Sequence, residues 1–247
     1  MALAAAIEPS AIASWPAREQ IAFEGWILRF SEGSSHRGNS AATLGTPLPG
    51  PALLARIERE YRARGLAALV QITPLSPAGL ESVLADRGWC SVAPTRVMTA
   101  PVADATARNE DPGDARHVSV ADEAFRRLVV GGSRNAADGE ERLNVLARLE
   151  APSAAIVAYA EGTAVACGVT VVTPPWAAIY VMRTEAAWRR QGHGRRVLRA
   201  LARAARKNGA EGLYLQVEEN NAPASALYAK AGFADGYAYR FLRAPSG

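Results

Sequence analysis

The feature that most constrains this chain is a glycine-containing turn at residues 188–194, with the sequence WRRQGHG. Residues 177–184 before the turn have the composition of a strand, and residues 195–207 after it have the spacing of a helix. The N–H groups in the first turn of a helix have no partner within that helix, so this arrangement directs donors at an anionic ligand. A pyrophosphate is the ligand that we expect here.

The residue pattern in the second half of the chain predicts a sheet with helices around this turn. The pattern indicates helices at 123–130, 139–150, 195–207 and 222–230, and strands at 117–120, 154–160, 165–172, 177–184, 213–217 and 237–242. Turn residues at 161–163 and 173–175 join three of these strands into an antiparallel meander. Asp122 is a capping residue type at the start of the helix at 123.

The first half shows a similar succession of elements. Helices are indicated at 3–14, from 53 to a stop at Gly65, and at 80–87, and strands at 21–30, 40–44, 66–73 and 95–99. Residues 102–116 lose apolar periodicity, which is typical of a linker or a long exposed loop. We therefore expect domains at 1–101 and 117–247, with a linker at 102–116.

Two segments, 71–101 and 216–245, share one layout of strand, helix, glycine plus aromatic residue, and strand. This echo predicts two copies of one fold. The alternative is that unrelated strand–helix–strand units look alike. The first copy has prolines at 47, 49 and 51 where the glycine turn would lie, and proline has no N–H to offer a phosphate. We therefore expect one cofactor site in the chain.

Composition limits the class of protein. Of 247 residues, 49% are apolar and 21% are charged, which is typical of a globular protein. No run of 18 apolar residues occurs, so we expect no membrane contact, and Glu8-Pro9 ends the apolar start too early for a signal peptide. Cys90 and Cys167 lie in apolar segments, which indicates buried thiols and a cytoplasmic protein. The histidines lack ligand spacing, so we expect no metal.

The formal net charge of +4 rests almost entirely on arginine. Most arginines alternate with glutamates along helices, as in residues 56–60, which is typical of solvated helix faces. A nucleic-acid or ribosome-associated protein using the basic helix at 195–206 is an alternative that we disfavour. A denser arginine cluster flanks the glycine turn, where a phosphate-rich ligand would benefit from it: Arg189, Arg190, Arg195, Arg196 and Arg199.

Two motifs resemble those of the GCN5-related N-acetyltransferase (GNAT) superfamily. Residues 189–194, RRQGHG, are similar to its Arg/Gln-x-x-Gly-x-Gly/Ala signature, although Ala186 stands where many members carry proline. Residues 221–233, NAPASALYAKAGF, are similar to its motif Asn-x-x-Ala-x-x-Leu-Tyr-x-x-x-Gly-Phe. The implied fold class is α/β (α+β), a mixed, mostly antiparallel central sheet flanked by helices. A smaller, truncated GNAT-like domain would precede it, as in tandem members.

The resemblance implies an N-acetyltransferase that uses acetyl-CoA as co-substrate and acetylates a primary amine of a small molecule, amino acid or peptide. The pantetheine arm would lie in a splay of the sheet against the backbone of Met182 and Thr184, and the pyrophosphate on the N–H groups of residues 191–194. The residues expected to touch the cofactor are Met182, Arg183, Thr184, Arg189, Arg190, Gln191, Gly192, His193, Gly194, Asn221 and Tyr228.

Acetyl transfer needs a neutral amine and a proton for the leaving thiolate. Tyr228 matches the position of the superfamily's tyrosine acid; the alternative is a tyrosine that packs on the core. Glu218 is the candidate base, through a water, unless it and Glu219 are solvated loop carboxylates. We interpret His193 as a spacer near the pyrophosphate, and Asn221 as either a helix start or a pantetheine contact.

The acceptor is the least constrained part of the hypothesis. Strand alternation predicts that Tyr180 and Arg183 lie on opposite faces, and one of them could line the acceptor pocket. Asp122, Glu123 and Asp138 could attract a cationic amine. The alternative function is a catalytically silent acyl-CoA-binding or sensing module, and both a monomer and a homodimer remain open.

Overall fold

The computed structural model describes residues 1–32, 35–45, 47–106 and 113–245, which form two compact units. Unit 1 comprises the described residues of 1–9, 17–96 and 237–247, and unit 2 those of 10–16 and 97–236. Helix α1 (Ala2–Ala13) and strands β5 (Cys90–Pro101) and β11 (Ala234–Arg243) therefore contribute residues to both units. The expected domain boundaries at 101 and 117 remain a prediction, because the two compact units are made of discontinuous ranges that do not coincide with them.

Unit 2 is built on a mixed sheet with the strand order β5-β10-β9-β8-β7-β6. Its other strands are β6 (Ala115–Val118), β7 (Ser153–Ala160), β8 (Thr163–Thr173), β9 (Trp176–Thr184) and β10 (Gly212–Glu218). Strands β6 to β9 pair antiparallel, which confirms the predicted meander, and β10 pairs parallel with β9. The pairing thus changes from antiparallel to parallel at β9, the strand that precedes the glycine turn.

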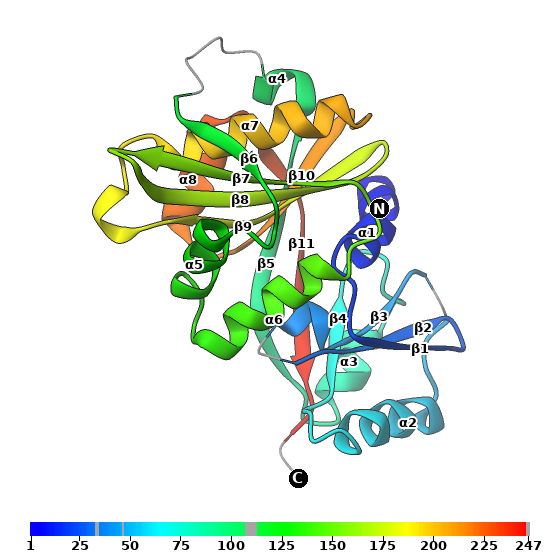
Figure 1. Ribbon diagram of the computed structural model, residues 1–247. Helices are drawn as coiled ribbons and strands as arrows, with labels where there is room; N and C mark the ends of the chain where they lie inside the picture. Colours follow the sequence, from blue (N-terminus) through cyan, green and yellow to red (C-terminus); the bar gives the residue numbers. More distant parts are fainter. Residues whose placement is uncertain (33–34, 46, 107–112, 246–247) are drawn as a thin grey trace. The chain divides into compact units, whose positions relative to one another are not determined.

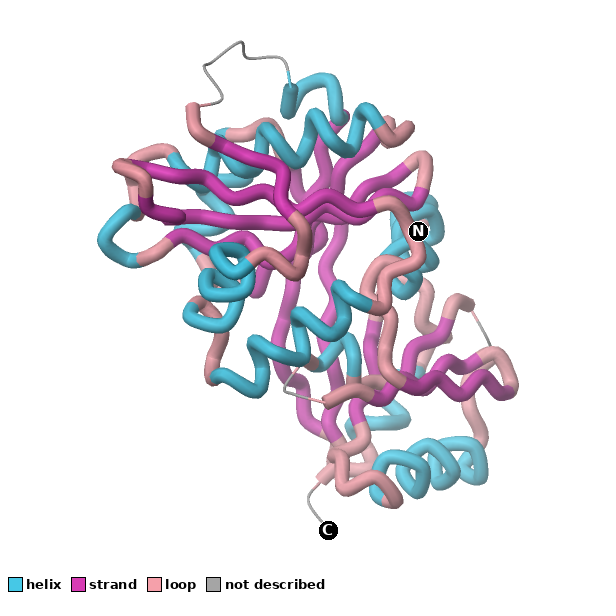
Figure 2. The backbone as a smooth tube through the Cα atoms, viewed as in Figure 1, coloured by secondary structure: helices cyan, strands magenta, loops and turns pink. Residues whose placement is uncertain are grey.

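Helices cover both faces of the unit 2 sheet, as Figures 1 and 2 show. They are α4 (Val102–Thr106), α5 (Glu123–Gly131), α6 (Ala136–Ala147), α7 (His193–Lys207) and α8 (Ala222–Lys230). Helices α5 and α7 lie against opposite faces of β7 and β8. Helix α7 buries Val197, Leu198 and Leu201 in the core, as predicted.

Capping side chains set where α5 and α6 begin. The Asp122 side chain accepts a hydrogen bond from the Phe125 N–H at 3.0 Å, which confirms the predicted cap. Helix α6 begins at Ala136, earlier than the expected residue 139, because the Asn135 side chain accepts from the Asp138 N–H at 2.9 Å. Asp138 therefore belongs to the helix and not to a loop.

Unit 1 has its own mixed sheet and core. Besides the starts of α1 and β5 and the end of β11, it contains strands β1 (Glu19–Phe23), β2 (Trp26–Phe30), β3 (Ala41–Thr43) and β4 (Leu69–Ile72) and helices α2 (Pro51–Arg62) and α3 (Leu80–Ala85). The prediction of a single strand at 21–30 is wrong. It is a hairpin, because Glu24 and Gly25 have φ values of 48° and 76° and form a tight turn.

The predicted echo appears as a repeated order of elements. Strands β1-β2-β3, helix α2, β4, α3 and β5 match β7-β8-β9, α7, β10, α8 and β11. Strand β4 pairs parallel with β3, and β10 pairs parallel with β9. The closing strands are exchanged, however: β11 pairs with β4 in unit 1, whereas β5 lies next to β10 in unit 2.

Two further expectations need correction. Of the expected linker, residues 107–112 lie outside the described residues, and residues 102–106 form α4, whose Val102 and Ala105 are buried in the unit 2 core. Cys167 is buried as predicted, but Cys90 is exposed. Within the described ranges, no helix is both long and apolar enough to cross a membrane.

Gly168 on β8 faces helix α7. A Cβ at this position would lie 2.6 Å from the Met182 Sδ and 2.9 Å from the Leu201 Cδ1. We expect Gly168→Ala to lower the free energy of unfolding by about 1–3 kcal/mol through overpacking. Denaturant unfolding measures this, with Gly131→Ala as control because a Cβ there meets nothing within 4 Å. Equal stability of the two variants would contradict the prediction.

Candidate active site

Strand β9 carries a β-bulge close to the glycine turn. Val169 of β8 lies opposite Tyr180, and Cys167 lies opposite Arg183, so three steps along β9 match two along β8. Within this bulge Val181 has a φ of 53°, a left-handed value that is rare for a β-branched residue. Sequence reasoning missed the bulge because valine is a strand-favouring residue. A bulge re-aims the side chains that follow it.

The bulge corrects the expected orientation of two candidate residues. Tyr180 and Arg183 lie on the same face of the sheet, because their partners on β8 are two residues apart. The face covered by α7 instead carries Met182, which lies against Gly168. Met182 and Arg183 therefore face opposite sides of the sheet at the point where the cofactor is expected.

Strands β9 and β10 pair at one end and extend beyond their shared register. The pairing runs from Trp176 opposite Gly212 to Ile179 opposite Leu215. Strand β9 then continues to Thr184, and β10 continues to Glu218. The arrangement agrees with the expected splay in the sheet, which begins earlier along β9 than residue 184.

The glycine turn ends in the uncapped start of α7. Gly192 is the N-cap residue, with a φ of 89° and no side-chain cap, and Arg190 in the same turn has a φ of 64°. The helix begins at His193, two residues before the expected start. Its first N–H groups are not capped by a side chain, so this helix end has the properties of an anion site.

Two long side chains of the turn bond to nearby backbone. The Arg189 Nε donates to the Thr184 carbonyl, and the Gln191 Nε2 donates to the Ala187 carbonyl, both at 3.2 Å. Ala187 belongs to the short 3₁₀ turn η2 (Ala186–Trp188). The first bond ties the turn to the end of β9, and the second ties it to η2. They indicate that both side chains stabilise the turn, and that the backbone N–H groups of the turn are the ones available to a ligand.

The His193 side chain packs inside the protein. The residue is 5% exposed, and its ring lies edge-on to Trp188 with 5.8 Å between centroids. Burial, with Arg196 as a second cause, lowers the pKa of His193, so the imidazole is neutral at pH 7. Such a ring suits the spacer interpretation better than a role as base.

Tyr228 is buried on α8, beside Phe233, with 6.0 Å between ring centroids. Burial raises the pKa of its hydroxyl to about 12, against a smaller opposing effect of Arg183. The hydroxyl therefore carries its proton at neutral pH and can donate it. The geometry fits both the acid role and the packing role considered from the sequence.

Asn221 and Glu218 lie between β10 and α8. The Asn221 side chain accepts from the Ala224 N–H at 3.2 Å, so the residue caps α8, one of the two roles considered for it. Glu218 ends β10 with an exposed side chain, and its carbonyl accepts from the Asn221 N–H at 2.9 Å. The role of Glu218 as base remains a prediction.

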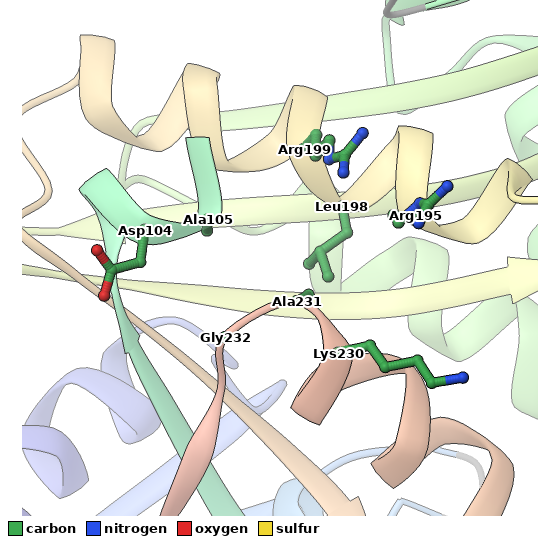
Figure 3. A pocket seen from close by; sticks show the side chains of 8 residues that line it. All are labelled: Asp104, Ala105, Arg195, Leu198, Arg199, Lys230, Ala231 and Gly232. Atoms are coloured by element: carbon green, nitrogen blue, oxygen red, sulfur yellow. The ribbon is translucent and has the colours of Figure 1, made fainter. Parts of the chain in front are cut away.

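A basic hollow of about 200 Å³ lies between α4, α7 and α8. Figure 3 shows Arg195 and Arg199 on α7, Lys230 at the end of α8, and Asp104 on α4. Among the described residues, the lining comprises Asp104, Ala105, Arg195, Leu198, Arg199, Lys230, Ala231 and Gly232. The arginine cluster indicated a basic surface near the turn, but Lys230 and α4 had no signal in the sequence.

The hollow is close to the start of α7. A Cβ on Gly194 would lie 3.5 Å from the Leu227 Cδ2, so the first turn of α7 contacts α8. Lys230 is one helical turn beyond Leu227. Elsewhere in the ranges that the structure describes, no group of three His, Cys, Asp or Glu side chains is placed to hold a metal ion.

Comparisons with known proteins agree with this geometry. Residues 4–242 match a family model described as probable histone acetyltransferase Rv0428c C-terminal. The chain is 30% identical over 233 residues to the uncharacterized N-acetyltransferase YobR of Bacillus subtilis, covering 92% of this chain and 93% of that protein.

Solved structures show the same fold. A GCN5-related N-acetyltransferase from Kribbella flavida superposes with a TM-score of 0.74 at 18% identity, covering 100% of this chain and 96% of the other. A GNAT-family structure from Novosphingobium aromaticivorans gives a TM-score of 0.58 at 17% identity, covering 92% of each chain. At these identities the likeness concerns the fold.

Proposed function

Because the chain belongs to the GNAT superfamily, within the family that matches residues 4–242, we propose that it transfers the acetyl group of acetyl-CoA to a primary amine of a small molecule, amino acid or peptide. The observation that carries this proposal is the uncapped start of α7 beside the bulged end of β9. The first offers donors to a pyrophosphate, and the second offers free strand edge to an extended arm.

Acetyl-CoA would lie along these groups from one end to the other. The N–H groups of residues 191–194 would hold the pyrophosphate, and the backbone of Met182 and Thr184 would pair with the pantetheine arm. The basic hollow would receive the phosphorylated ribose. Among the residues that the structure describes, Arg195, Arg199 and Lys230 line it together with Asp104, and cationic side chains favour a phosphate.

Transfer would proceed by direct attack of the amine. The amine nitrogen forms a bond to the thioester carbonyl carbon, the C–S bond breaks, and the thiolate takes the proton of the Tyr228 hydroxyl. The proton lost by the amine passes to a base, for which Glu218 acting through a water is the candidate. Cys167 is not suited to act as a nucleophile, because burial raises the pKa of its thiol to about 12.

Turnover with a panel of amines tests this proposal. The expected result is free thiol released from acetyl-CoA in step with an acetylated amine, detected by mass spectrometry. Tight binding of acetyl-CoA without amine-dependent thiol release across the panel would favour the silent acyl-CoA-binding module.

The basic hollow gives a separate prediction about the phosphorylated ribose. We expect CoA to bind about three- to thirtyfold more tightly than dephospho-CoA, because a charge-assisted contact would be lost. Arg199→Gln should remove this preference and leave dephospho-CoA binding unchanged. Arg203→Gln, one turn further along α7 and outside the hollow, is the control. Equal weakening of both ligands by Arg199→Gln would contradict the assignment.

A further inference from the structure

Arg183 lies on the face of the β9 strand opposite the α7 face, immediately beside the bulge. A Cβ on Gly132, at the end of α5, would lie 2.5 Å from the Arg183 Cδ, so the stem of the side chain packs against α5. Its guanidinium also interacts electrostatically with Cys167 of β8 and Tyr228 of α8. The group is therefore partly buried next to the tyrosine proposed as acid.

The guanidinium has more donors than the surrounding protein uses. An arginine offers five N–H donors. Among the described residues, its one hydrogen bond is from Nη1 to the Met182 carbonyl at 3.1 Å, and its buried Nε has no acceptor. A buried donor without a partner costs free energy, so a water or a ligand that accepts from it would be stabilising.

The acidic residues near this face are already engaged. Asp138 of α6, 3% exposed, accepts from the Arg142 Nε at 3.0 Å, and Glu141 accepts from the Arg148 Nη2 at 2.7 Å. The Asp122 carboxylate caps α5. The expectation that Asp122 and Asp138 attract a cationic amine therefore loses its basis, whereas the same expectation for Glu123 stays a prediction.

Among the described residues, the charged groups that act on the Arg183 guanidinium are Arg142 and Asp138, which leaves one positive charge in excess. Arg183 and Arg142 are both near Asp138, whose carboxylate balances one of them. A planar guanidinium fork fits a carboxylate in two parallel hydrogen bonds. A site with one net positive charge matches a singly charged carboxylate better than a doubly charged phosphate.

We propose, on the basis of the proposed function, that Arg183 binds a carboxylate of the acceptor, so that the acceptors are amino acids or peptides that carry a carboxylate near the reacting amine. The carboxylate meets the unused donors of Arg183. The amine then lies within a few bonds of it, at the end of β9 where the thioester is expected. Arg183 is thus a specificity residue for the acceptor and not a cofactor contact.

Matched acceptors test this proposal directly. Each amino acid is compared with its own carboxamide, which keeps the amine and removes the charge. We expect the wild-type chain to have a kcat/KM about tenfold to hundredfold higher for the amino acid. Arg183→Gln should abolish the difference by raising the KM for the amino acid, and the Kd for acetyl-CoA should stay unchanged.

Two further variants complete the experiment. Arg183→Lys keeps the charge but loses the fork, so it should restore only part of the preference. Arg126→Gln, an exposed arginine of α5 that pairs with Glu140, should leave the preference intact. Retained carboxamide turnover shows that each variant is folded.

The outcomes separate this proposal from the one on which it rests. If the wild-type chain acetylates carboxamides or simple amines as well as amino acids, only the carboxylate proposal is wrong. A loss of acetyl-CoA affinity in Arg183→Gln would also overturn it, in favour of a cofactor contact. If no amine is acetylated at all, the proposed function fails and the carboxylate proposal fails with it.

Discussion

Replacing Tyr228 with phenylalanine is expected to lower kcat at least about a hundredfold, while the Kd for acetyl-CoA changes by less than about twofold. The hydroxyl is the group proposed to protonate the leaving thiolate, and the ring that packs beside Phe233 is retained in the variant. Loss of a group that acts only in the transition state lowers the rate without weakening ground-state binding.

The pH dependence gives a second readout for the same variant. Because burial raises the pKa of Tyr228 to about 12, the wild-type hydroxyl stays protonated as the pH rises past the usual tyrosine value of 10. The wild-type rate should therefore show no alkaline loss near pH 10 from this group. Tyr159→Phe, on β7, is the matched control and should keep full turnover. Unchanged kcat in Tyr228→Phe would exclude the tyrosine as the acid.

Gly192→Ala is expected to weaken acetyl-CoA binding by about tenfold to hundredfold. The φ of 89° at this position is strained for alanine by about 1–3 kcal/mol, and relief of that strain would move the N–H groups at the start of α7. Titration calorimetry measures the Kd, and circular dichroism checks that the variant is folded.

A neighbouring glycine provides the matched control for this variant. A Cβ on Gly194 would lie 3.4 Å from the Thr184 Oγ1, which is an ordinary contact. Gly194→Ala should therefore change the Kd by about twofold or less. The same loss of affinity in both variants would show that the turn geometry at Gly192 is not what holds the ligand.

Local sequence patterns predicted the elements that depend on local interactions. Helix α8 was expected at 222–230 and is found at Ala222–Lys230, because Asn221 caps it and Gly232 follows it. The meander of β7, β8 and β9 follows from its turn residues in the same way. The two motifs at 189–194 and 221–233 similarly led to the family that the comparisons show.

Features that depend on pairing between strands could not be read from the chain. The bulge at Val181 inserts one residue into a run that looks like regular strand, so the alternation that predicts opposite faces for Tyr180 and Arg183 is wrong. The exchange of β5 and β11 depends on partners far apart in sequence. Both are decided by tertiary pairing, which residue propensity does not encode.

The sequence also misled about the Asp138 carboxylate, because the start of α6 is hard to predict. With α6 expected to start at residue 139, Asp138 was interpreted as a free loop carboxylate. The cap at Asn135 moves the start of the helix back and puts Asp138 four residues before Arg142, where the two form an ion pair. A one-turn error at a helix start thus reversed the expected sign of the charge.

The glycine turn before α7 is proposed to form the single acetyl-CoA site of the chain. Calorimetric titration of the full chain with acetyl-CoA tests it most directly. We predict one acetyl-CoA per chain, with the binding heat strongly reduced in Gly192→Ala and retained in Gly194→Ala. Two equivalents per chain, or a Kd that Gly192→Ala leaves unchanged, would contradict this proposal.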